Sequence, residues 1–99
     1  MSDSGAQKYP MPGAQCLQHV CKHSVSDDKP IMLDYWTESI EGTAMVGVKE
    51  NGEKLLVKSE DEYTSPIVKI YKADDEYIII TENSIYIVSA KIPTRRIMA

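Results

Sequence analysis

Four side chains that can bind zinc lie close together near the start of the chain: Cys16, His19, Cys21 and His23. If this segment is a helix, with about 100° between successive residues, Cys16, His19 and His23 share one side and Cys21 points away. Ligands from one rigid helix cannot surround a tetrahedral ion, and structural zinc sites usually combine two ligand-bearing segments. No second Cys-x-x-Cys or His-x-x-x-His pair occurs. We therefore expect no metal site and no cofactor.

Two sets of neighbouring residues could supply a nucleophile and a base: Cys21 with His23, or Ser24 with His23 and Asp27. Nucleophilic sites bring such partners together from separated elements and hold them rigidly, whereas these residues follow one another in a Ser-rich segment. No Gly-rich phosphate loop is present. The sequence therefore predicts a protein that is not an enzyme.

Acidic residues outnumber basic ones by 15 to 11, which gives a formal net charge of −4. Binding to nucleic acid requires clustered Lys and Arg, so this balance argues against DNA or RNA as a partner. The acidic triplets at 60–62 and 74–76 lack the spacing of a calcium-binding loop, and we interpret both as solvated turns between strands.

The segment Met1–Gly5 has neither the basic nor the apolar region of a signal peptide, and no apolar run approaches the 18 or so residues that cross a bilayer. We expect a cytoplasmic or otherwise intracellular protein that is not secreted and does not bind membranes. In a reducing compartment Cys16 and Cys21 are expected as free thiols.

Composition divides the chain into three parts. Residues 1–30 are rich in Ser, Gly, Pro and Asp and predict a flexible arm with a short helix over 14–23. Residues 31–92 predict a small β domain, and 93–99 a C-terminal tail. The fold class is therefore mainly β: a small antiparallel curled sheet or barrel, resembling SH3-like and β-roll modules in architecture alone.

About six short strands are expected in that domain. The clearest local signal is Asn51-Gly52, which is typical of a type I′ turn in a hairpin. That turn would place Val48 opposite Leu55 and Val46 opposite Val57, giving one apolar core face, with Leu56 on the wet face. The expected strands cover residues 31–36, 43–50, 53–58, 67–72, 76–81 and 85–91.

The two strands Tyr77–Thr81 and Ile85–Val88 are apolar at nearly every position. A strand with one wet face should alternate, so both faces of this hairpin are predicted to be covered. Pairing would set Tyr71 opposite Ile78 and Ile80 opposite Ile85. We assign Ile78, Ile80, Ile85 and Ile87 to the core. The reverse face would meet a partner through Ile70, Tyr77, Ile79, Tyr86 and Val88.

These patterns favour a small non-enzymatic β module that mediates protein–protein contacts, as a homo-oligomer or as an accessory subunit. The aromatic set of six Tyr, one Trp and no Phe suits such surfaces. Alternatively, the arm containing Leu17 and Val20 could fold back over the second face. A further alternative is a small ligand-binding or inhibitor protein with an aromatic-lined pocket formed by Tyr35, Trp36 and Tyr63.

Overall fold

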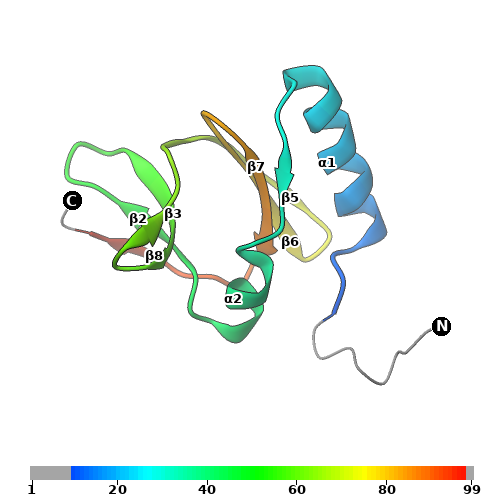
Figure 1. The fold of residues 1–99 in the computed structure, drawn as a ribbon. Helices are drawn as coiled ribbons and strands as arrows, with labels where there is room; N and C mark the ends of the chain where they lie inside the picture. The colour runs from blue at the N-terminus through cyan, green and yellow to red at the C-terminus, as the bar shows by residue number, and fades with distance from the viewer. Residues whose placement is uncertain (1–9, 98–99) are drawn as a thin grey trace.

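The computed structural model describes residues 10–97, which form two helices and eight short strands (Figure 1). The helices are α1 (Ala14–Asp27) and α2 (Trp36–Glu41). The strands are β1 (Ile31–Met32), β2 (Met45–Val48), β3 (Lys54–Ser59), β4 (Glu62–Tyr63), β5 (Ile67–Ala73), β6 (Glu76–Thr81), β7 (Ile85–Ser89) and β8 (Thr94–Arg96).

The strands of the described region form two four-stranded sheets. The first sheet has the order β1-β7-β6-β5 and the second has the order β4-β3-β2-β8. The prediction of a mainly β protein is confirmed, but the strands form two open sheets in place of one curled sheet or barrel. Neither sheet is purely antiparallel, because β1 runs parallel to β7 and β8 runs parallel to β2.

Helix α1 packs against one face of the first sheet (Figure 1). Cys16 and Val20 from the helix are buried there against the side chains of β6 and β7. The helix is longer than the predicted 14–23: it ends at Asp27 and is capped by Asp28, which adopts a left-handed conformation with φ of 55°. The Ser24 hydroxyl donates to the Lys29 carbonyl at 2.6 Å, which closes the helix end.

The strand predicted over 31–36 ends at Met32, and the chain then turns into α2. Tyr35 and Trp36 have high strand propensity, but tertiary contacts determine their conformation. The Trp36 indole N–H donates to the Pro10 carbonyl at 2.9 Å, and the Ser39 hydroxyl accepts from the Ser89 backbone N–H at 2.9 Å. These contacts hold the turn of helix against β7 and the N-terminal segment.

The hairpin between β2 and β3 forms at the predicted place with a different turn. Gly52 donates to the Lys49 carbonyl at 2.9 Å, and the Lys49 N–H donates to the Glu53 carbonyl at 2.8 Å. Gly52 has φ of 91°, whereas Asn51 is not among the residues with positive φ. The predicted type I′ turn is therefore wrong. The hydrogen bonds enclose a three-residue loop with its glycine in the left-handed region.

The longer loop moves the register by one residue. Val46 pairs with Leu56 and Gly47 with Leu55, so the predicted core face of Val46, Val48, Leu55 and Val57 is wrong. Because side chains alternate, a one-residue shift exchanges the faces of one strand. Leu56, expected to be wet, is fully buried with Val46 between the sheets.

The central hairpin of the first sheet agrees with the sequence. The predicted pairs Tyr71 with Ile78 and Ile80 with Ile85 are both present. Ile78, Ile80, Ile85 and Ile87 pack under α1. The reverse face packs against the second sheet, so both faces are covered within one chain. The second core contains Tyr35, Ala44, Val46, Leu56, Ile79, Val88 and Ile92.

Candidate functional site

The outer edge of β5 is the most extensive unpaired strand edge in the described part of the molecule. β5 has seven residues and lies at one end of the first sheet. The other terminal strands, β1, β4 and β8, have only two or three residues each. An edge strand presents a row of backbone N–H and C=O groups that can pair with another chain. Among residues 10–97, no strand occupies that position beside β5.

The side chains of this edge are unusually exposed for a strand with so many apolar residues. Val68 is 57% exposed, Ile70 38% and Tyr71 37%. Lys69 and Tyr71 pair with Ile80 and Ile78, whose side chains lie under α1. Because side chains alternate, Ile70 lies on the opposite face, toward the second sheet. Both faces of the edge therefore offer apolar contact.

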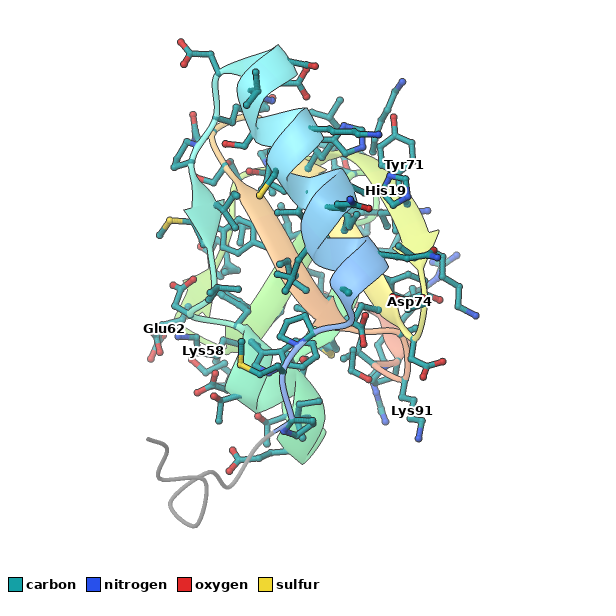
Figure 2. All side chains as sticks on the ribbon, turned by 90° about the vertical axis from the view of Figure 1, so that its right-hand side faces the viewer. His19, Lys58, Glu62, Tyr71, Asp74 and Lys91 are labelled. Carbon is teal, nitrogen blue, oxygen red and sulfur yellow. The ribbon has the colours of Figure 1, made fainter. Side chains whose placement is uncertain are left out.

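Contacts with α1 and β6 hold β5 in place. The ring of His23 on α1 stacks on Tyr71, with centroids 4.7 Å apart and an interplanar angle of 22°. Lys69 Nζ lies 6.0 Å from the centroid of the same ring. Asp74, with φ of 56°, forms the tight turn into β6. Figure 2 shows Tyr71 beside α1 and Asp74 nearer the lower end, both on the flank of the molecule opposite Glu62 and Lys58.

A hollow of about 430 Å³ lies between α1 and β5. Three of its lining residues, His23, Lys29 and Lys69, carry nitrogen bases or cations, and Asp27 is the one carboxylate. Lys29 Nζ donates to the Thr81 carbonyl at 2.7 Å, which fixes its position at the rim. The hollow lies on the helix side of the first sheet, beside the open edge of β5.

The five residues predicted to form a partner interface lie together on one face of the first sheet, but the second sheet covers most of that face. Ile79 and Val88 are fully buried between the sheets, so neither offers surface to a partner here. Tyr77 and Tyr86 are half-buried and pack against the same core. Ile70 alone lies on the exposed edge.

The three aromatic residues predicted to line a ligand pocket lie in different places. Tyr35 is buried between the sheets and Trp36 lies in the core under α1. Tyr63 is 59% exposed and lies at a hollow of about 490 Å³ on the outer face of the second sheet. This outer hollow has an aliphatic lining that includes Leu55 and Val57.

The four possible zinc ligands of α1 do not gather around one point. Cys16 is buried against the sheet, whereas Cys21 is exposed to solvent. Across residues 10–97, no group of three or more His, Cys, Asp or Glu side chains could hold a metal ion. Burial raises the pKa of the Cys16 thiol to about 11, with further contributions from Glu76 and Asp74. A thiol in that environment is a poor nucleophile.

Tyr35 and the half-buried Tyr86 pack together in the core between the sheets. Burial raises the pKa of Tyr35 to about 12, with smaller contributions from Tyr86 and nearby carboxylates. Burial likewise raises the pKa of Tyr86. Such groups stay protonated and stabilise the core between the sheets.

Neither of the two described helices is long and apolar enough to cross a bilayer.

No protein-family model, curated protein or solved structure matches this chain. The candidate site therefore depends on its own geometry. The sequence pattern predicted Ile70 but not the strand edge that contains it. Lys69 and Lys72 interrupt otherwise apolar strand faces. Because lysine is common on exposed edge strands, these two residues were the signal that β5 lies at an edge.

Proposed function

We propose that this chain is a protein-binding module that accepts an additional β-strand along the outer edge of β5. The observation that carries the proposal is the seven-residue unpaired edge with exposed Val68, Ile70 and Tyr71. In strand addition, main-chain hydrogen bonds supply affinity and neighbouring hollows select side chains. The hollow between α1 and β5 supports this mode of binding.

The shape of the edge also supports strand addition over docking of a flat surface. Three apolar side chains within four consecutive positions cannot all be covered from one face, because neighbours point to opposite sides of the sheet. A strand beside β5 contacts both sets at once. It also satisfies the backbone groups that a helix or loop lying on one face would leave in water.

The test is selection of a library of random twelve-residue peptides on the full-length protein, followed by mapping of the selected peptides by amide NMR shifts. We expect the largest shifts within 67–73. The Ile70→Lys variant should lose the selected peptides. The matched variant Val25→Lys should retain them, because Val25 is 84% exposed on α1. Peptides that shift other residues, or bind Ile70→Lys unchanged, would overturn the proposal.

A second candidate function is binding of an apolar small molecule in the outer hollow of the second sheet. Its volume of about 490 Å³ suits a drug-sized ligand, and Tyr63 stands at its rim. Fragment screening by NMR should then shift Val57 and Tyr63, and Tyr63→Ala should weaken the hits. A screen that yields no shift around Val57 would reject this function.

A further inference from the structure

The charge pattern of β5 differs from that of the rest of the chain. Within 67–73 there are two lysines, Lys69 and Lys72, and no carboxylate, although acidic residues outnumber basic ones in the chain by 15 to 11. Neither lysine forms an ion pair with another described residue. The edge is therefore a short basic segment on an acidic protein.

The two lysines lie on opposite faces of the sheet. Lys69 pairs with Ile80 on the helix side, and Lys72 pairs with Tyr77 on the side of the second sheet. Between them lie Ile70 and Tyr71, one on each face. A strand added to β5 therefore meets two neighbouring apolar residues with a lysine on either side of them.

On this basis we infer that the strand accepted by β5 comes from a different protein and carries the pattern acidic-apolar-apolar-acidic. In an antiparallel pair the two carboxylates lie opposite Lys72 and Lys69, and the apolar residues lie opposite Tyr71 and Ile70. Opposite charges on directly facing strand positions are favourable, whereas like charges are unfavourable. This inference rests on the proposed function of the edge.

The hollow beside α1 supports the same assignment. The partner residue opposite Lys69 projects toward the helix side, where Lys29, Lys69 and His23 line the hollow. A carboxylate there would lie among basic groups, with Asp27 as the one opposing charge. A basic side chain at the same position would meet two lysines.

A second copy of the chain is a poorer occupant. Antiparallel self-pairing centred on Ile70 would place Lys69 and Lys72 opposite Tyr71 and Val68 of the other copy, so neither lysine would face a carboxylate. It would also bring together two molecules that each carry a formal net charge of −4. Lysines on an edge discourage pairing between identical strands. The same two residues therefore disfavour self-association and favour an acidic strand.

The test compares three synthetic peptides that share a central Val-Ile pair and identical flanking Thr residues. They differ only in the residues on either side of that pair: Glu-Val-Ile-Glu, Gln-Val-Ile-Gln and Lys-Val-Ile-Lys. Binding to the full-length protein is followed by NMR titration at two salt concentrations. We expect the Glu peptide to bind about tenfold tighter than the Gln peptide. That advantage should shrink at high salt, and the Lys peptide should bind weakest.

The charge-reversed protein K69E/K72E should exchange the order of the Glu and Lys peptides. Equal binding of the Glu and Gln peptides with shifts within 67–73 would overturn the acidic pattern and leave strand addition at β5 standing. No shift within 67–73 with any peptide, combined with a library selection that also avoids this edge, would overturn both. A concentration-dependent dimer abolished by Ile70→Lys, seen by light scattering, would overturn the choice of a different protein.

Discussion

The rings of Tyr35 and Tyr86 meet edge to face between the two sheets, with centroids 5.2 Å apart and planes inclined at 76°. Tyr35 precedes α2 and Tyr86 lies on β7 of the first sheet. Lys58 Nζ, from the second sheet, lies 4.8 Å from the centroid of the Tyr35 ring. The two contacts of the Tyr35 ring therefore join three parts of the chain that are distant in sequence.

Alkaline pH should weaken the fold through Tyr35. The folded state raises its pKa from 10.0 to about 12, so between these values the folded protein holds the proton more tightly than the unfolded chain. The contribution of Tyr35 to the free energy of unfolding is complete below pH 10 and declines as pH rises toward 12. The free energy of unfolding should fall by at most about 1.4 kcal/mol per pH unit.

Urea unfolding at several pH values between 8 and 11 measures this decline. The Tyr35→Phe variant should show a shallower slope above pH 10 than the wild type. Tyr63→Phe serves as the control because Tyr63 is exposed, and its slope should match the wild type. Identical slopes for Tyr35→Phe and the wild type would contradict the prediction.

Helix α1 should contribute to stability through its buried side alone. Val20 is 1% exposed and Val25 on the same helix is 84% exposed. Val20→Ala removes two buried methyl groups and leaves a cavity, so we expect a loss of about 2 kcal/mol. Val25→Ala should change stability by less than about 0.5 kcal/mol. Chemical denaturation compares the two, and equal effects would mean that the helix does not pack as described.

Ser39 should be required for the contact between α2 and β7. Its hydroxyl donates to the Trp36 carbonyl at 2.6 Å and accepts from the buried Ser89 N–H at 2.9 Å. Ser39→Ala leaves that N–H without a partner, at a cost of about 1 to 3 kcal/mol. Hydrogen exchange of the Ser89 amide should also accelerate. Ser59→Ala, which removes an exposed bond to Asp61, is the control and should have little effect.

The two cysteines should react with iodoacetamide at very different rates. Cys21 is exposed, whereas Cys16 is 0% exposed and its pKa is raised to about 11. Mass spectrometry of the native protein at pH 8 should show one rapid addition, which the Cys21→Ser variant abolishes. Cys16 should react only when the protein unfolds. Two rapid additions to the native protein would show that α1 leaves the sheet on the timescale of labelling.

The central hairpin of the first sheet was predictable because its strands are apolar at nearly every position and their connections are short. The register of the β2–β3 hairpin was not, since Asn51-Gly52 suits more than one turn and the hydrogen bonds of Lys49 decide between them. A difference of one residue there moved Leu56 from the predicted wet face into the core.

The local signal at Tyr35 and Trp36 was misleading for a different reason. Both residues favour strands, yet a hydrogen bond from Trp36 to the Pro10 carbonyl and burial of Tyr35 between sheets favour a turn and a short helix. The candidate site was only partly predictable. Ile70 was identified by its apolar character, but its exposure depends on the position of β5 at the end of the sheet.

The parallel pairs at the sheet margins constrain the order of folding during synthesis. β1 pairs with β7, which follows it in the sequence by more than half the chain length, and β2 pairs with β8. Neither pair can close until the later strand has left the ribosome, and such distant pairings slow folding. The buried side of α1 must wait as well, because the side chains that cover Cys16 and Val20 come mainly from β6 and β7.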